Sequence, residues 1–242
     1  HPVQVSASTY NLIKLAVYES KQNFGFNALI GPVVKLWHIG FKGAHVPTDE
    51  QIKEKMGLTN PGDVRLDDDN QTVFLTKKGM ELDLGGIAKG YIADRIRDLW
   101  RAYDVRAGII NLGGNVLFVN SSPKRASGEW ILGVQDPKKK RGNNLTTATV
   151  HECSAVTSGT YERFLEINGK KYHHIIDPKT GYPVKTHVAG VTLFTRDSVQ
   201  AEIECKRLFF AGGPIPGWKN DKAGRYGAIF VYDDDSMERI GV

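Results

Sequence analysis

Hydrophobic and polar residues recur along the chain with two different spacings, which together predict a mixture of helices and strands. Between residues 8 and 22, apolar side chains such as Leu12, Ile13 and Ala16 follow the spacing of an amphipathic helix. A second helix is expected to begin at the acidic turn of residues 48–51, where the helix dipole favours carboxylates, and to stop before Gly57. Longer helices are expected at residues 87–103 and 198–210. Strands are expected at residues 72–76, 109–112, 116–119, 130–134, 163–167 and 188–194.

The order of these elements favours an α+β fold with a mostly antiparallel sheet and flanking helices. Strands outnumber helices in the second half and often follow one another directly, which suits antiparallel pairing better than a doubly wound parallel sheet. The chain has no internal repeat and no linker rich in Pro, Gly or Ser, so we expect one domain over residues 1–242. No apolar run approaches the roughly 20 residues needed to cross a bilayer.

Charge and cysteine content narrow the possible partners. The 242 residues carry a net charge of +5, but the basic residues are scattered except at residues 138–141. That run lies between Pro137 and Gly142, so we expect a solvated loop rather than a phosphate-binding patch, and no nucleic-acid partner. Cys153 and Cys205 form neither a disulfide framework nor a metal-binding spacing. The sequence begins at His1 without a signal or lipidation motif, so we expect it to be truncated at its N-terminus.

Two glycine pairs are candidates for phosphate contacts. In the segment DLGGIAKGY, at residues 83–91, two glycines precede a predicted helix, where free N–H groups and the helix dipole favour an anion. A tight turn between a strand and a helix explains these glycines equally well. In NLGGN, at residues 111–115, a bulge or a turn is the alternative explanation.

Hydroxyl, imidazole and carboxylate groups cluster in residues 155–161 and 172–183. Either His173 or His174 could accept a proton near neutral pH, as activation of a hydroxyl nucleophile requires. Adjacent residues of a strand point to opposite faces, so at most one of these histidines should enter a given site. Further along, Glu202 and Lys206 are four residues apart on a predicted helix, which by itself indicates an exposed ion pair.

Taken together, these segments resemble the ApbE-like FAD:protein FMN transferases. The resemblance rests on LDLGGIAKGYIAD at residues 82–94, NLGGNV at 111–116, WILGVQDP at 130–137, AVTSGTYERF at 155–164 and YHHIIDPKTGYP at 172–183. A further segment, IGPVVKLWHIG at residues 30–40, is also similar to the family. The order and spacing of the motifs agree, so the resemblance covers nearly the whole chain.

The resemblance implies a T-fold-like α+β architecture that binds FAD in a cleft, with Mg²⁺ at the diphosphate. It places the catalytic role on His174, which either deprotonates the acceptor hydroxyl or orients the phosphate that this hydroxyl attacks. The residues implied in FAD binding are Trp37, His38 and Ile39 at the adenine end, Asp83, Gly85 and Tyr91 beside the phosphates, and Thr157, Ser158 and His174.

The chain departs from the family pattern at the implied metal site. The family ligands are the backbone carbonyl at the position of Ala88, an Asp where this chain has Glu202, and a Thr where it has Lys206. An ammonium group cannot be a metal ligand and would repel the cation. Lys206 either replaces part of the metal's charge on the diphosphate or pairs with Glu202. Another Asp of the family corresponds to Asn27.

The expected function is transfer of FMN from FAD to a Thr or Ser hydroxyl of an acceptor protein, with release of AMP. Two alternatives stay open: an FAD pyrophosphatase that releases FMN and AMP, and an FAD-binding protein without turnover, which the lysine at position 206 motivates. The family resemblance also implies an extracytoplasmic lipoprotein or another membrane-anchored enzyme.

Overall fold

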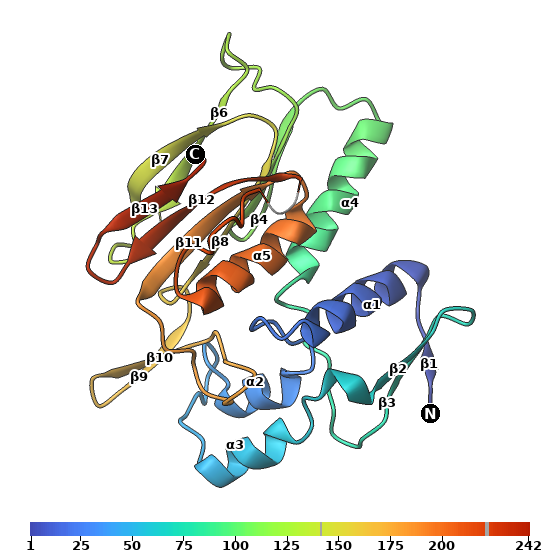
Figure 1. The fold of residues 1–242 in the computed structure, drawn as a ribbon. Helices are drawn as coiled ribbons and strands as arrows, with labels where there is room; N and C mark the ends of the chain where they lie inside the picture. The colour runs from blue at the N-terminus through green and yellow to red at the C-terminus, as the bar shows by residue number, and fades with distance from the viewer. Residues whose placement is uncertain (141, 221–222) are drawn as a thin grey trace. The chain divides into compact units, whose positions relative to one another are not determined.

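The computed structural model describes residues 1–140, 142–220 and 223–242, which form two compact units (Figure 1). Unit 1 contains His1–Gly86 and Glu162–Lys185, and unit 2 contains Ile87–Tyr161 and Thr186–Val242. The structure contains both helices and strands, and the described strand pairs are antiparallel. The predicted α+β class is therefore confirmed. The expectation of a single domain stays a prediction.

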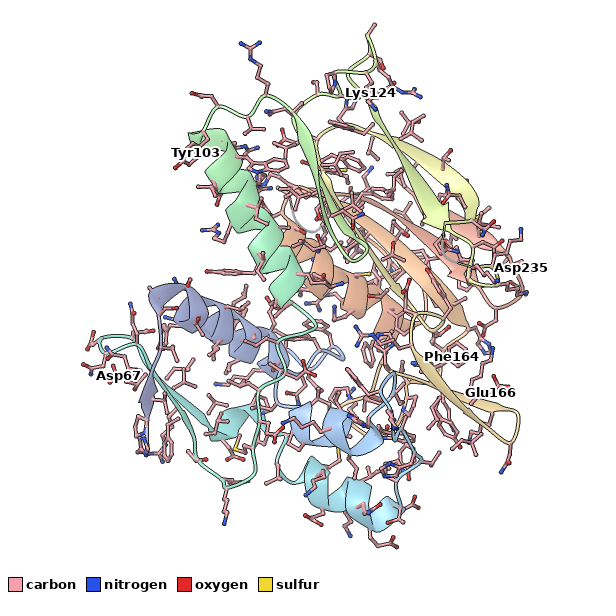
Figure 2. The ribbon with its side chains drawn as sticks, turned by 180° about the vertical axis from the view of Figure 1, so that it is seen from behind. Asp67, Tyr103, Lys124, Phe164, Glu166 and Asp235 are labelled. Carbon is pink, nitrogen blue, oxygen red and sulfur yellow. The ribbon has the colours of Figure 1, made fainter. Side chains whose placement is uncertain are left out.

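Unit 1 combines three helices with two small sheets. Helix α3 (Asp49–Met56) begins with a reciprocal cap: the Thr48 hydroxyl accepts from the Gln51 backbone N–H, and the Gln51 side chain accepts from the Thr48 N–H. The other elements are helices α1 (Ala7–Lys21) and α2 (Gly31–Trp37), a 3₁₀ turn (Pro61–Asp63), a sheet of β1 (Val3–Gln4), β3 (Thr72–Leu75) and β2 (Val64–Asp67), and a hairpin of β9 (Phe164–Ile167) and β10 (Lys170–His173). Phe164 and Glu166, both on β9, are labelled in Figure 2.

The core of unit 1 joins its two chain segments around Trp37. This side chain is fully buried, and its indole Nε1 donates a hydrogen bond to the Gly181 carbonyl over 2.8 Å. The Tyr172 and Tyr182 rings lie 5.5 and 5.8 Å from the Trp37 ring. Because buried indole N–H groups need a partner, this hydrogen bond holds the 162–185 segment against α2.

Unit 2 is built on a six-stranded antiparallel sheet. Its strand order is β13 (Met237–Ile240), β12 (Arg225–Tyr232), β11 (Val188–Thr195), β8 (Ser154–Gly159), β5 (Asn115–Val119) and β4 (Gly108–Leu112). Helices α4 (Ala88–Ala102) and α5 (Ser198–Ala211) and a hairpin of β6 (Trp130–Gln135) and β7 (Asn144–Val150) complete the unit (Figure 1).

The two faces of this sheet are covered by different elements. On β5, Leu117 belongs to a cluster with Ala93 of α4, whereas the next residue, Phe118, packs with Trp130 of β6. Successive residues of a strand point to opposite faces, so the helices cover one face and the β6–β7 hairpin covers the other. Unit 2 thus has three layers.

Most predicted elements lie where the sequence pattern indicated. Helix α2 was not predicted; Pro32 lies in its first turn, where proline is tolerated. The basic run is a turn over the described residues Lys138–Lys140, and Lys138 pairs with Asp235 at 2.7 Å. The loop prediction is confirmed there, whereas Arg141 lies outside the described residues. Within the part of the chain that the structure describes, no helix is both long and apolar enough to span a membrane.

Candidate functional site

The residues implied in flavin and metal binding are divided between the two units. Unit 1 carries Trp37, His38, Ile39, Asp83, Gly85 and His174, whereas unit 2 carries Ala88, Tyr91, Thr157, Ser158, Glu202 and Lys206. The motif at residues 82–94 runs from unit 1 into unit 2, because the units meet along the chain at Gly86 and Ile87.

The centre of the unit 2 site is the buried carboxylate of Glu202 on α5. Its side chain is 4% exposed. Lys206 donates from Nζ to Oε2 over 3.0 Å and to the Glu202 backbone carbonyl over 3.2 Å. Lys89 of α4 places Nζ 3.8 Å from Oε1. The sequence alone indicates an exposed pair at these positions, but Glu202 is buried and Lys206 is only 18% exposed.

A third donor reaches Glu202 from β5. Asn115 donates from Nδ2 to Oε1 of Glu202 over 3.0 Å, and its Oδ1 accepts from the Ser198 hydroxyl over 2.8 Å. Burial acts to raise the pKa of Glu202, but Lys206, Lys89 and Asn115 outweigh it and leave this pKa below its ordinary value. The carboxylate is therefore ionised near neutral pH.

Glycine in the AKGY motif permits the close approach of α4 and α5. A Cβ atom built on Gly90 would lie 2.7 Å from the Ser198 carbonyl carbon and 2.8 Å from Cγ of Glu202. Real Cβ atoms essentially never approach that closely. Gly90 thus lets Lys89 reach Glu202. The role of Gly90 in the fold is therefore helix contact, which the sequence analysis did not predict.

The carboxylate of Asp94 joins the same two helices one turn further along. Its oxygens accept from the backbone N–H groups of Ser198 and Val199 over 2.9 and 2.8 Å, which are the first two residues of α5. Arg97 lies 3.2 Å from the same carboxylate. Asp94 therefore caps the N-terminus of α5 from α4.

The residues at the implied metal position do not fit a divalent cation. Three N–H donors surround Glu202, and the oxygen of Asn115 is taken by Ser198. Mg²⁺ instead requires several oxygen ligands in near-octahedral geometry. Among the described residues, no group of three or more His, Cys, Asp or Glu side chains could hold a metal ion. Ala88, the first residue of α4, could offer a backbone carbonyl but no charged group.

Thr157 and Ser158 of β8 point to opposite faces of the sheet. The Thr157 hydroxyl lies 2.8 Å from the Thr192 hydroxyl, on the face that carries Ala155 and the β6–β7 hairpin. Ser158 lies on the helix face and forms a hydrogen bond with Cys205 of α5, whose pKa burial raises to about 11. Only Ser158 shares the face of Glu202. Tyr91, also assigned to flavin binding, is half-buried on α4, and the Arg95 guanidinium lies 5.6 Å from its ring centroid.

The two adjacent histidines of unit 1 have different surroundings. His173 contacts the Val184 carbonyl through Nε2 at 2.9 Å and accepts from the Ile175 N–H through Nδ1 at 3.3 Å. Both of its ring nitrogens thus hold the backbone together. His174 places Nδ1 3.2 Å from the Arg163 carbonyl. Since a carbonyl oxygen only accepts, the neutral His174 ring carries its proton on Nδ1 and its basic lone pair on Nε2.

The residues assigned to the adenine end differ in exposure. Trp37 and Ile39 are buried in the core of unit 1, so any contact with a nucleotide has to come from their backbone. His38 is exposed at the left-handed C-cap of α2, with φ 53°, and its ring stacks on Phe41 at 5.2 Å. Only His38 of these three offers a side chain to a ligand.

The turn before α4 is organised by Asp83. Its Oδ1 accepts from the Gly85 N–H over 2.8 Å, and its own N–H donates to the Ala28 carbonyl over 2.7 Å. Gly85 is exposed. The second glycine pair is simpler: Gly113 and Gly114, with φ of 63° and 95°, form the two-residue turn between β4 and β5. The predicted turn is therefore confirmed for these two glycines, whereas a phosphate contact there stays a prediction.

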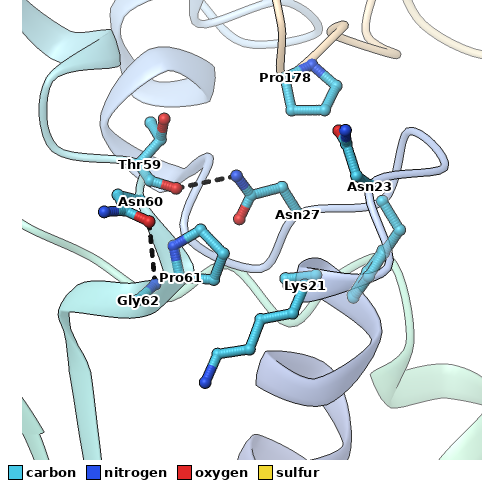
Figure 3. A pocket seen from close by; sticks show the side chains of 10 residues that line it. Lys21, Asn23, Asn27, Thr59, Asn60, Pro61, Gly62 and Pro178 are labelled. Atoms are coloured by element: carbon cyan, nitrogen blue, oxygen red, sulfur yellow. Dashed lines mark hydrogen bonds between the residues drawn. The ribbon is translucent and has the colours of Figure 1, made fainter.

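Unit 1 also contains a pocket of about 480 Å³ beside Asn27 (Figure 3). Asn27 donates from Nδ2 to the Thr59 carbonyl over 2.9 Å and accepts from the Leu29 N–H over 2.8 Å. The amide therefore holds the segment before α2 to the turn after α3. Lys21, Asn60 and Pro178 also line the pocket.

Four residues of the unit 2 site escaped the sequence analysis: Lys89, Asp94, Asn115 and Ser198. Three of them, Lys89, Asp94 and Asn115, lie inside the motifs LDLGGIAKGYIAD and NLGGNV. The polar residues of these motifs, rather than their glycines, were the sequence signal that could have indicated the contacts around Glu202.

Comparisons with known proteins agree with this arrangement of motifs. The ApbE family model matches residues 1–229. An FAD:protein FMN transferase of Klebsiella pneumoniae (strain 342) is 45% identical over 213 residues, which cover 88% of this chain and 65% of that protein. An FAD:protein FMN transferase of Treponema pallidum (strain Nichols) is 38% identical over 223 residues, covering 87% and 62%. The chain thus spans less than two thirds of the length of these curated relatives.

Solved structures share the fold. The crystal structure of the ApbE protein from Thermotoga maritima superposes with a TM-score of 0.87 at 31% identity, covering 99% of this chain and 77% of that one. The apo flavinyl transferase ApbE of Pseudomonas stutzeri gives a TM-score of 0.78 at 22% identity, with coverage of 99% and 74%.

Proposed function

Because the chain belongs to the ApbE family, we propose that the full-length protein is an FAD:protein FMN transferase. It moves FMN from FAD onto a Thr or Ser hydroxyl of an acceptor protein and releases AMP. The observation that carries the proposal is the 45% identity to the Klebsiella relative, which is named FAD:protein FMN transferase. The Treponema relative has the same name.

The reaction is a phosphoryl transfer between two oxygen atoms. The acceptor hydroxyl oxygen bonds to the phosphorus of the FMN half, and the bond from that phosphorus to the bridging oxygen breaks. AMP leaves with the bridging oxygen and the electron pair of the broken bond. Such reactions depend mainly on positioning and charge stabilisation, because the protein has little covalent chemistry to do.

We assign to His174 the role of the general base that accepts the proton of the acceptor hydroxyl. The contact of its Nδ1 with the Arg163 carbonyl supports this role, because Nδ1 then carries the proton of the neutral ring and Nε2 carries the basic lone pair. In the proposed reaction Nε2 takes the proton as the hydroxyl oxygen attacks. We further propose that His38, Asp83, Gly85, Tyr91 and Ser158 contact FAD through exposed or half-buried groups, and that Trp37, Ile39 and Thr157 contribute through the backbone.

Among the described residues of unit 2, magnesium has no matching ligand set, so no step of this mechanism depends on it. Three donors already surround the Glu202 carboxylate, and the position implied for a Thr ligand carries Lys206. The positive charge that the diphosphate requires has to come from the chain itself.

The central test measures the fate of FAD. The full-length protein is incubated with FAD and a candidate acceptor, and the acceptor mass and released AMP are measured together. A mass gain of one FMN per acceptor is expected. Release of AMP without an adduct would identify water as the nucleophile, and the absence of both products with every acceptor would leave FAD binding alone.

Replacing His174 with asparagine tests the assigned base. The Asn amide can still donate to the Arg163 carbonyl, but it has no nitrogen lone pair that accepts a proton. Transfer should fall by at least about a hundredfold, while FAD affinity stays within about tenfold. His151→Asn, at an exposed histidine of unit 2, is the matched control and should transfer normally. Full activity of His174→Asn would exclude the assigned role.

We also propose that the protein acts outside the cytoplasmic membrane, as a lipoprotein or another anchored enzyme. This is supported by the family resemblance. Fractionation of cells that express the full-length protein should recover it with the membrane or the exported fraction. Recovery in the cytoplasm would contradict the proposal.

A further inference from the structure

We propose that the ammonium groups of Lys206 and Lys89 take the place of the implied magnesium ion, so that FMN transfer by this protein needs no divalent cation. The inference rests on the proposed function, because it concerns how the same site handles the diphosphate of FAD. It differs from the family pattern and follows from the contacts of Glu202.

Each carboxylate oxygen of Glu202 already accepts a hydrogen bond from a group of this chain. Lys206 and Asn115 each donate to one carboxylate oxygen over 3.0 Å, and Lys89 lies 3.8 Å from Oε1. Asn115 cannot turn its oxygen toward a cation without losing its hydrogen bond from Ser198. The carboxylate is therefore surrounded by donors, whereas a magnesium site consists of acceptors.

The charges of the cluster lead to the same conclusion. One carboxylate and two ammonium groups give a local charge of +1, counted from Glu202, Lys206 and Lys89. A divalent cation at this carboxylate would lie within a few ångströms of both ammonium groups and would be repelled by them. A diphosphate, in contrast, is attracted to the excess positive charge.

Lys206 is the more important of the two lysines. Its side chain is 18% exposed, whereas that of Lys89 is 43% exposed and more strongly screened by water. Lys206 also donates to the Glu202 backbone carbonyl, so its position is fixed within one helical turn. The ammonium is thus a preorganised charge that requires no binding step.

The first experiment compares transfer with and without divalent cations. The full-length protein is freed of metal, and FMN transfer from FAD to the acceptor is measured in a chelator and in Mg²⁺. The two rates should agree within about twofold. A loss of tenfold or more in the chelator, restored by Mg²⁺, would overturn the inference and leave the proposed function intact.

The second experiment measures metal binding directly. It therefore tests the inference even if the protein does not transfer FMN. Mn²⁺ serves as a spectroscopic substitute for Mg²⁺, and the free Mn²⁺ signal is recorded by electron paramagnetic resonance with protein and FAD. The wild type should leave the signal of free Mn²⁺ unchanged. One tightly bound Mn²⁺ per wild-type chain would overturn the inference, whether or not FMN is transferred. Absence of transfer under all metal conditions would count against the proposed function instead.

Lys206→Thr should create the metal requirement that the wild type lacks. The substitution removes the ammonium and supplies a hydroxyl oxygen beside Glu202, as in the family pattern. Its transfer should fall at least about tenfold in the chelator, recover in Mg²⁺, and be accompanied by binding of one Mn²⁺.

Two further variants separate charge from ligand effects. Lys206→Met keeps most of the length of the side chain but offers neither charge nor oxygen, so Mg²⁺ should restore its activity less than that of Lys206→Thr. Lys124→Thr makes the same change at an exposed lysine of unit 2 and should leave both rate and Mn²⁺ binding unchanged. A Lys206→Thr variant that is fully active in the chelator would show that the ammonium has no part in transfer.

Discussion

Replacing Asp94 with asparagine removes a charged cap from helix α5 while the size and shape of the side chain stay the same. In the wild type, both carboxylate oxygens accept backbone N–H groups, from Ser198 over 2.9 Å and Val199 over 2.8 Å. Asparagine has one oxygen, so it can satisfy only one of them. Its Nδ2 group then faces either the Val199 N–H, or both the Ser198 N–H and the Arg97 guanidinium, and all of these are donors.

The size of the effect follows from these contacts. One buried N–H without a partner costs about 1–3 kcal/mol, and loss of a negative charge at a helix N-terminus adds about 0.3–1 kcal/mol. Burial raises the pKa of Asp94 despite its hydrogen bonds from Ser198 and Val199 and the nearby Arg97. The charge itself is therefore penalised in the folded state, so we expect the lower part of the range, about 2 kcal/mol. For a chain of this length, that corresponds to a decrease in Tm of roughly 4–8 °C.

Thermal and urea unfolding, followed by circular dichroism, measure this change. Asp98→Asn is the matched control, because Asp98 lies one turn further along α4, is 46% exposed and pairs with Arg95 at 2.7 Å. Exposed pairs contribute little, so this control should lose no more than about 0.5 kcal/mol. If Asp94→Asn is as stable as Asp98→Asn, the capping of α5 from α4 does not stabilise the fold and the reasoning fails.

Two further predictions concern the same pair of helices. Gly90→Ala should lower the free energy of unfolding by about 1–2 kcal/mol, because the clash of its Cβ with the Ser198 backbone exceeds the gain in helix propensity. Urea titrations measure this change, and an unchanged or higher stability would contradict the close contact. Glu202→Gln should lose about 3 kcal/mol at neutral pH, the lower end of the cost of removing one partner of a buried ion pair, because Lys206 keeps partial access to water. The folded-state pKa of Glu202 is lowered, so the carboxylate stabilises the fold above its unfolded pKa and loses this contribution as pH falls through the folded pKa. The stability difference between wild type and Glu202→Gln should therefore shrink below about pH 4 in urea titrations at stepped pH, and a difference that grows on acidification would refute the assignment.

The helices were predictable because their signals are local. Helix α3 has its acidic first turn and its Thr48–Gln51 cap within four residues of sequence, and the predicted range 87–103 differs from α4 (Ala88–Ala102) by one residue at each end. Such patterns reflect the periodicity of one helix and its own caps. Strand β8 was not expected, because its hydroxyl residues and Gly159 hide the apolar alternation.

The site was less accessible to sequence reasoning because its contacts join distant positions. Asn115 and Glu202 are 87 residues apart in the chain, and no local pattern pairs them. Local pattern left a turn open for Gly113 and Gly114, which form a hairpin turn, but it gave no signal that Gly90 lies at a helix contact. The family resemblance assigns Trp37 and Ile39 to flavin binding, but it did not reveal that both side chains are buried in the core.

Strands β8 and β11 are hydrogen-bonded neighbours, with Gly159 opposite Gly190, although residues 162–185 lie between them in the sequence and belong to unit 1. Residues 1–86 therefore need a segment about 75 residues further along the chain before Trp37 can donate to the Gly181 carbonyl. Unit 2 likewise joins residues on both sides of that segment. Neither unit can form from one continuous stretch of chain, and contacts between residues so far apart in sequence are slow to form.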